Sequence, residues 1–386
     1  MTEPTITPEC VKVSGSRIRY DRLKAWLQGN GERLARTVLE EDDILSRLNL
    51  AVRQPSSGGC FAQTSEWFAE GISDSPTYVL GDTHGDIDSL IAILDNILDR
   101  TGEGKDPVVL LLGDVLDRNA ESCALECALI LSVLQRALPE EFESFNRICL
   151  GIVKGDHDVA LGYAEPYAPE TRFTSVVRPA DFCEWLNGRL EGGGGEPKTL
   201  IGRAWVRLMG ICPAAVFHGP TGTLLAHGGI ARCDLQARFV AGEADVFQSP
   251  AAAQDFSWCR MVDAKKKLLN RNSKTCSIGG EEFDAFCKLA LPEPSDGEVQ
   301  MTMVRRFVFG HQHPSAGFEQ YVKWYDGYEV LCLSSFRDDG ALFGPTIPHF
   351  CQLPQTQEGL AGVRVYRLEL AFDDDSTAQV SDDTVK

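Results

Sequence analysis

The protein has 386 residues, with 37 Lys or Arg and 56 Asp or Glu, so its formal net charge is −19. Hydrophobic residues make up 43% of the chain and charged residues 24%, which excludes collagen-like, coiled-coil and fully disordered proteins. This length accommodates one large domain or two small ones. The acidic balance argues against nucleic acids and anionic membranes as main partners, because such partners attract Lys and Arg.

The N-terminal residues 1–17 lack the basic start and the apolar run of a secretory signal. No stretch of the sequence approaches the roughly 20 apolar residues that a membrane-spanning helix needs. The 13 cysteines form no CxxC pair, which favours reduced thiols. We therefore expect a cytoplasmic protein without a membrane partner, and the sequence leaves its oligomeric state open.

The chain divides into segments that differ in composition and in hydrophobic periodicity. Residues 1–75 are expected to form a helical N-terminal extension, because apolar residues recur at helical spacing between residues 20 and 51. Over residues 76–371, short apolar runs alternate with helical segments, which favours an α/β domain. Within it, prolines and a run of four glycines indicate an inserted loop region at residues 162–200, with a helix near its middle. Residues 372–386 are acidic and polar, and we expect them to be disordered.

Five short motifs combine Gly with Asp or His, and each directly follows an apolar run of strand length. In chain order they are Gly81-Asp82-Thr83-His84-Gly85, Gly113-Asp114-Val115-Leu116-Asp117-Arg118, Gly155-Asp156-His157-Asp158, His227-Gly228-Gly229 and Gly310-His311-Gln312-His313. Groups at the carboxyl ends of such strands share one edge of a sheet, so we expect the motifs to lie together. Asp and neutral His suit Mn, Fe or Zn. The pattern therefore indicates a metal site, and it leaves His218 and His349 as structural residues.

The order of these motifs resembles that of the calcineurin-like metallophosphoesterases. The similarity is closest to the serine/threonine phosphoprotein phosphatases, whose pattern is GDxHG, GDxVDRG, GNHE, HGG and a late His. Flanking segments extend the resemblance over about residues 77–340; they are Cys212-Pro213-Ala214-Ala215, Asp255-Phe256-Ser257-Trp258, Gly279-Gly280-Glu281 and Ser334-Ser335-Phe336. The resemblance implies an α/β fold in which two mixed sheets form a β-sandwich flanked by helices (αββα).

The resemblance also implies two divalent metal ions, with Mn preferred and Fe or Zn as alternatives, that activate a water molecule for attack on a phosphate ester. Asp82 and His84 would hold the first metal and Asp114 would bridge both. The second metal would be held by Asp156, His227 and His311. His313 belongs to an HxH motif of the wider superfamily, and it would either ligate the first metal or support a ligand.

Further residues correspond to the catalytic and phosphate-binding groups of the family. His157 would be the general acid, oriented by Asp117, and Arg118 would bind phosphate oxygens. Lys154 stands where the family carries an Arg before its third motif. Arg271 lies within a residue of the position of another phosphate-binding Arg.

The sequence departs from the family pattern at three places. Asp156 replaces an Asn, which adds negative charge beside the substrate phosphate. Asn119 replaces the Gly that ends the second motif. The segment 334–338 reads Ser-Ser-Phe-Arg-Asp and lacks the tyrosine that the family carries there.

Three functions follow from this pattern. The first is hydrolysis of phosphoserine or phosphothreonine, with a phosphorylated protein or a small phosphate ester as the partner. The second keeps the metal chemistry and acts on dinucleoside polyphosphates or phosphodiesters. The third is a catalytically weak pseudophosphatase that serves as a binding module, and Asp156 motivates it.

Overall fold

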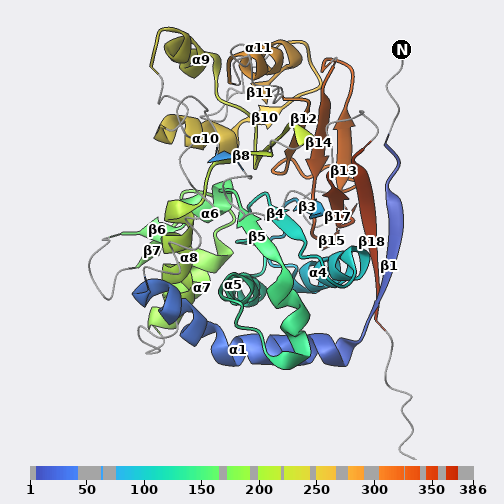
Figure 1. The fold of residues 1–386 in the computed structure, drawn as a ribbon. Coiled ribbons are helices and arrows are strands. Elements are labelled where there is room, and N and C mark those ends of the chain that lie inside the picture. Colours follow the sequence, from blue (N-terminus) through green and yellow to red (C-terminus); the bar gives the residue numbers. More distant parts are fainter. Residues whose placement is uncertain are drawn as a thin grey trace, which may run out of the picture.

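A computed structural model of the chain shows two mixed six-stranded β-sheets at its centre (Figure 1). The structure describes residues 6–41, 62–63, 75–164, 172–191, 199–218, 221–243, 249–266, 277–290, 304–325, 327–339, 345–354 and 362–372. The two sheets pack face to face with helices on both outer sides, so the αββα sandwich that the family resemblance implies is confirmed.

The first sheet contains both parallel and antiparallel pairs. Its strands are, in spatial order, β1 (Glu9–Gly15), β18 (Arg364–Phe372), β17 (His349–Gln352), β3 (Thr77–Leu80), β4 (Val108–Leu111) and β5 (Cys149–Ile152). The last three run parallel to one another, and β17 is antiparallel to both of its neighbours. The carboxyl ends of β3, β4 and β5 therefore lie at one edge of the sheet.

The second sheet has the order β13 (Phe318–Tyr321), β14 (Glu329–Leu333), β12 (Arg306–Phe309), β9 (Thr223–Ala226), β8 (Ala215–His218) and β2 (Ala62–Gln63). Its central strand β12 is parallel to both β9 and β14. Within the described residues, three two-stranded sheets accompany the large ones. They pair β6 (Gly162–Tyr163) with β7 (Phe173–Thr174), β10 (Arg260–Met261) with β11 (Ser277–Ile278), and β15 (Asp338–Asp339) with β16 (Pro345–Thr346).

Alternation along the strands creates three hydrophobic layers. Val108 and Leu110 of β4 lie in the layer between the sheets with Val308 of β12, whereas Val109 and Leu111 face the helices on the outside. Successive side chains of a strand point to opposite faces, and here both faces are covered. This explains why the runs are continuously apolar rather than alternating with polar residues.

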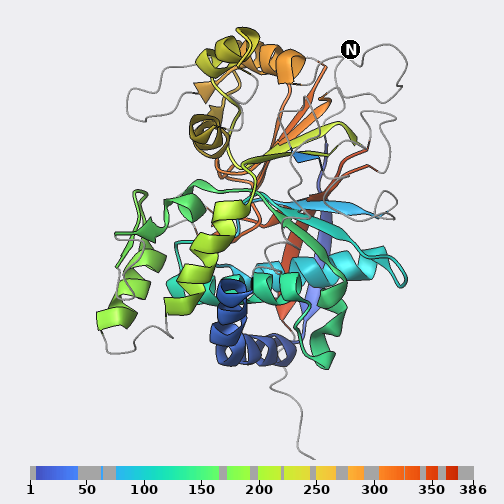
Figure 2. The ribbon, with the colours of Figure 1, turned by 60° about the vertical axis from the view of Figure 1, so that its left-hand side comes forward.

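Helices cover the outer face of each sheet (Figures 1 and 2). The first sheet carries α1 (Arg17–Glu40), α4 (Ile87–Thr101), α5 (Ala120–Gln135), η2 (Glu140–Arg147), α7 (Asp181–Arg189) and α8 (Leu200–Ile211). The second sheet carries α9 (Cys233–Val240), α10 (Pro250–Trp258) and α11 (Gly280–Ala290). Among the described residues no single helix is long and apolar enough to cross a membrane, and one bent pair, α5 with η2, meets that test jointly.

The N-terminal segment is part of the first sheet and its helical layer. Strand β1 was not predicted, and it pairs in parallel with β18. Helix α1 crosses the outside of α5 and α8, with Leu23, Leu27 and Leu34 fully buried in the same core. Residues 42–61 and 64–74, which include the rest of the expected helical stretch, lie outside the described residues, as does the acidic tail from residue 373 onward.

We predict that Leu27→Ala lowers the free energy of unfolding by about 2–5 kcal/mol, because it leaves a cavity in the core of the first sheet. Thermal or urea unfolding followed by circular dichroism measures this change. Ile18 lies on the same helix and is 50% exposed, so Ile18→Ala is the control and should change stability by less than about 0.5 kcal/mol. A local loss of helix without a shift of the main transition would contradict the shared core.

Candidate metal centre and active site

The five sequence motifs meet where the two sheets converge. Asp82, Asp114 and Asp156 follow β3, β4 and β5 of the first sheet, and His227 and His311 follow β9 and β12 of the second. The five side chains are buried. The structure therefore brings the ends of five strands from both sheets to one place.

Glycines permit this close approach. A Cβ atom on Gly310 would lie 2.0 Å from Oδ1 of Asp82, and one on Gly155 would lie 2.1 Å from the backbone nitrogen of Asp114. The sheets are also joined directly, because Asp82 and Ser334 form an isolated parallel β-bridge. Any side chain at these two glycines would push the strand ends apart.

Backbone strain is concentrated in the motifs. In the described part of the chain, seven non-glycine residues have positive φ, and six of them belong to the motifs: His84, Asp114, Asp117, Arg118, His311 and His313. Such conformations cost free energy and persist where the surrounding structure enforces them, as it does at functional sites.

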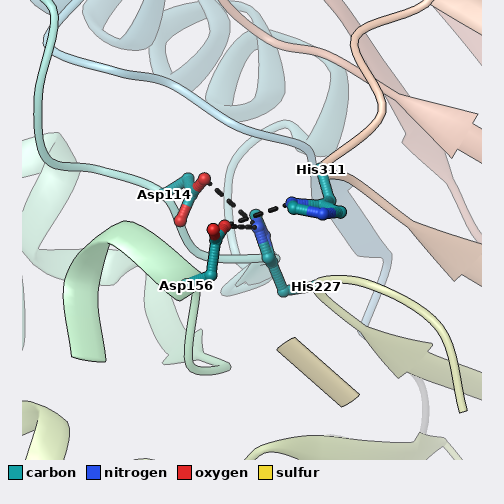
Figure 3. Close-up of side chains that lie close together, drawn as sticks. All are labelled: Asp114, Asp156, His227 and His311. Atoms are coloured by element: carbon teal, nitrogen blue, oxygen red, sulfur yellow. Dashed lines mark hydrogen bonds and ion pairs between the residues drawn. The ribbon is translucent and has the colours of Figure 1, made fainter. Parts of the chain in front are cut away.

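Four side chains form the first group, which we call the Asp156 cluster: Asp114, Asp156, His227 and His311 (Figure 3). Oδ1 of Asp156 lies 3.0 Å from Nε2 of His227 and 3.1 Å from Nδ1 of His311. Oδ2 of Asp114 lies 3.2 Å from the same Nε2 atom. One atom of each residue points to a common centre, as ligands around a cation do.

Three side chains form the second group, the Asp82 cluster: Asp82, His84 and His313. Oδ2 of Asp82 lies 3.2 Å from Nδ1 of His313. Oδ2 of Asp114 lies 3.8 Å from Nε2 of His84, so Asp114 stands between the two clusters. The described residues thus hold two adjoining groups of buried Asp and His, an arrangement suited to a dinuclear metal site.

Two backbone carbonyls fix the histidine tautomers. Nδ1 of His84 lies 2.8 Å from the carbonyl oxygen of Leu116, and Nδ1 of His227 lies 2.9 Å from that of Leu112. A carbonyl can only accept a hydrogen bond, so each Nδ1 carries a proton, and each Nε2 faces the clusters, where it could ligate a metal. This is the usual second contact of a metal-ligating histidine.

The hydrogen bonding leaves acceptors in the site for a cation. Nε2 of His84 and Oδ2 of Asp114 are buried and make no hydrogen bond. Buried polar atoms are nearly always satisfied, so two such atoms turned toward each other call for a further ligand. The donor set of carboxylates and imidazoles fits divalent Mn, Fe or Zn without selecting among them.

The pKa values of the buried carboxylates also favour a cation in this site. Burial and the neighbouring Asp114 raise the pKa values of both Asp82 and Asp158 to about 7. Burial would also raise the pKa of Asp156, but His311 and His227 outweigh it and hold that pKa well below its usual range. Carboxylates this close together repel one another, and cations between them would offset the repulsion.

Asp117 and His157 form a hydrogen-bonded pair beside the clusters. Oδ2 of Asp117 lies 2.6 Å from Nδ1 of His157, whose backbone N–H donates to Oδ1 of Asp114 at 2.9 Å. Burial lowers the pKa of His157, but Asp114 and Asp117 outweigh it and raise that pKa to about 9. Oδ1 of Asp117 accepts the backbone N–H of Phe182 at 3.0 Å, in the first turn of α7. Helix α7, within the region expected to be inserted, therefore supports this pair.

Arg118 contacts the Asp82 cluster through His313. Its Nη2 donates to Nε2 of His313 at 3.0 Å, and its guanidinium carbon lies 4.5 Å from the ring centre of Phe336. The Phe336 ring also contacts His84 and His313 edge-on, with ring centres 5.1 and 5.3 Å apart. The segment that lacks the family's tyrosine thus supplies an aromatic side chain to the site.

Of the two other predicted phosphate-binding residues, the structure describes only Lys154. Lys154 directly precedes Gly155 and is partly buried, and its backbone N–H donates to the carbonyl of Pro213. Arg271 lies outside the described residues. His218 and His349 are buried and belong to neither cluster; Nδ1 of His218 bonds Thr221 and Nδ1 of His349 bonds the carbonyl of Ile347.

The departure at Asn119 has a local explanation. Its side chain accepts the backbone N–H of Ser122 and caps the N-terminus of α5. Asn is among the preferred residues at this position. The helix that follows the second motif therefore begins directly after the position where the family carries its Gly.

Two buried acids support the site, and the sequence reasoning did not assign them roles. Asp158 accepts the backbone N–H of Asp114 at 2.7 Å, those of Val115 and Leu116, and the indole N–H of Trp205. Glu126 accepts the backbone N–H of Gly85 at 2.6 Å. Glu126 is the one charged residue in the apolar run 123–134. A lone charge in such a run is the sequence feature that could have identified it as a buried supporting residue.

Comparisons with known proteins agree with this geometry. The family model of calcineurin-like phosphoesterases matches residues 75–344. A solved serine/threonine phosphatase from Saccharomyces cerevisiae, described as similar to human phosphatase PP5, is 14% identical over 92% of this chain and 91% of its own, with a TM-score of 0.51. At that identity the likeness shows the fold alone.

A cold-active protein-tyrosine phosphatase from a Shewanella species is 13% identical over 72% of this chain and 75% of its own, with a TM-score of 0.39. No curated protein matches the sequence of this chain significantly.

We predict that Mn²⁺ raises the melting temperature of the protein, because it binds the folded clusters and not the unfolded chain. At a concentration 100-fold above its Kd, the expected stabilisation is about 2.7 kcal/mol. Asp114→Asn should abolish most of this shift, whereas Asp106→Asn, at an exposed position bonded to Arg147, should retain it. Equal shifts in both variants would contradict the metal centre.

Asp158→Asn should weaken Mn²⁺ binding by about 10–100-fold, since the amide cannot accept from all the N–H groups that hold Asp114 in place. Isothermal titration calorimetry measures this affinity. Asp158 itself belongs to neither cluster, so an unchanged affinity would show that the loop keeps its conformation without the carboxylate.

Proposed function

The chain belongs to the calcineurin-like phosphoesterase family, and we propose that this hydrolase cleaves phosphate monoesters, chiefly phosphoserine and phosphothreonine in proteins. The observation that carries the proposal is the Asp117–His157 pair, with its 2.6 Å contact, beside a buried Asp/His centre suited to two metal ions. The order of the motifs, which resembles that of the phosphoprotein phosphatases, supports this choice of substrate.

In this proposal the two clusters hold divalent cations, with Mn as the preferred metal. Asp82, His84 and His313 would hold one cation, Asp156, His227 and His311 the other, with Asp114 shared. Bound cations would polarise the phosphoryl oxygens and make a water molecule acidic enough to provide hydroxide near neutral pH.

His157 would protonate the leaving oxygen of the substrate. Its Nδ1 is occupied by Asp117, so its Nε2 is the atom that can donate to a leaving group. Its side chain keeps 13% of its surface exposed, which gives a substrate access, whereas the side chains of His84 and His227 are fully buried. Asp117 would hold the ring in place and stabilise its protonated form.

Arg118 would bind phosphate oxygens through its guanidinium, and Lys154 would add positive charge beside Asp156. The carboxylate at 156 makes the centre more negative than the amide of the related phosphatases would. This feature is the basis of the weak-enzyme alternative, because added negative charge reduces the Lewis acidity of a bound cation.

We predict that His157→Asn retains Mn²⁺ but lowers kcat by about 10²-fold or more for phenyl phosphate and phosphoserine peptides. The loss should be much smaller for p-nitrophenyl phosphate, because its leaving group departs without protonation. His349→Asn, the same substitution at a buried histidine in neither cluster, is the control. Equal losses on all esters, or loss of metal, would contradict a role as general acid.

The substrate class is tested with one Mn-loaded preparation and four substrates. We expect phosphopeptides and p-nitrophenyl phosphate to be cleaved faster than diadenosine tetraphosphate and bis-p-nitrophenyl phosphate. The reverse order would favour a dinucleoside polyphosphate or phosphodiester hydrolase. Full metal occupancy with no turnover on any of them would favour a pseudophosphatase.

A further inference from the structure

Arg118 and His313 make a contact that bears on both metal binding and substrate binding. Nη2 of Arg118 lies 3.0 Å from Nε2 of His313, and Nδ1 of the same ring lies 3.2 Å from Oδ2 of Asp82. The side chain of His313 is 9% exposed and that of Asp82 is fully buried. Both nitrogens of the His313 ring therefore face a charged group.

The chemistry of the two groups fixes where the proton of His313 lies. A guanidinium only donates hydrogen bonds, so Nε2 of His313 must be the acceptor and its proton must lie on Nδ1, toward the carboxylate of Asp82. In this state neither ring nitrogen offers a lone pair to a cation.

A cation in the Asp82 cluster requires a different arrangement. If Nδ1 of His313 ligates, the proton moves to Nε2, and two donors, Nε2–H and Nη2–H, then face each other at 3.0 Å. If the ring turns and Nε2 ligates instead, Arg118 directly loses this acceptor. Both arrangements break the bond to Arg118, and the cation also repels the guanidinium.

We propose that Arg118 and a cation in the Asp82 cluster compete for His313, so that cation binding releases Arg118 to hold the phosphate of the substrate. The competition is a property of the metal centre; the use of the released Arg118 rests on the proposed function. Phe336 is a positioning residue, because its ring lies under the guanidinium at 4.5 Å and can retain it after the bond to His313 breaks.

The competition predicts a reciprocal effect on affinity. Arg118→Met keeps a long apolar side chain on Phe336 and removes both the donor and the charge. We expect it to tighten binding of Mn²⁺ at one of the two sites by about 10-fold, measured by isothermal titration calorimetry on the full chain. In Mn-loaded protein, the same variant should bind inorganic phosphate more weakly than wild type.

Arg189→Met is the matched control, because Arg189 lies at the same 4.5 Å distance over the ring of Trp185 and outside both clusters. It should leave both affinities unchanged. Nitrogen-15 spectra of histidine-labelled protein, with His313 assigned through His313→Gln, provide a second readout. The imidazole should be protonated on Nδ1 without cation and lose that state as Mn²⁺ is added.

Unchanged or weaker Mn²⁺ binding in Arg118→Met would overturn the competition, as would a His313 ring protonated on Nε2 in cation-free wild type. These readouts need no turnover. An inactive protein that shows both expected effects would therefore contradict the proposed function and leave the competition intact.

Discussion

The repulsion among four buried carboxylates is the constraint on which the site depends. Asp82, Asp114, Asp156 and Asp158 lie where the two sheets converge, and none of them is more than 4% exposed. Such a group is stable only where donors and cations surround it. Backbone N–H groups donate to Asp82 and Asp158. Asp156 faces the imidazoles of His227 and His311, and Oδ2 of Asp114 makes no hydrogen bond and is left for a cation.

The same constraint explains the strained backbone. Turning an N–H group toward a carboxylate at the end of a strand requires unusual φ values, and His311 at φ 64° does this when it donates to Asp82 at 3.0 Å. The strands that precede each motif hold the backbone in these strained conformations. A site built from strand ends of two sheets thus obtains its rigidity from the hydrophobic layer between them.

Much of this could be predicted from the sequence, because apolar runs ending in Gly-Asp or His mark strand ends that must share an edge. The pairing of Asp117 with His157 also follows from the family pattern. The supports could not be predicted. They depend on which distant segments pack together, and the local hydropathy pattern does not determine that. Examples are the pairing of strand β1, the contact of the Asp158 carboxylate with the second motif, and the hydrogen bond from the Phe182 N–H to Asp117.

The parallel pairing of β1 with β18 has a consequence for how the chain folds. Among the described strands, the hydrogen-bonded neighbour of Glu9–Gly15 is Arg364–Phe372, more than 300 residues later. During synthesis the first strand leaves the ribosome long before its partner exists, and contacts of such high sequence separation form slowly. The pairing at this edge of the first sheet is therefore completed only after translation has passed residue 372. Until then β1 must be kept from pairing with other chains.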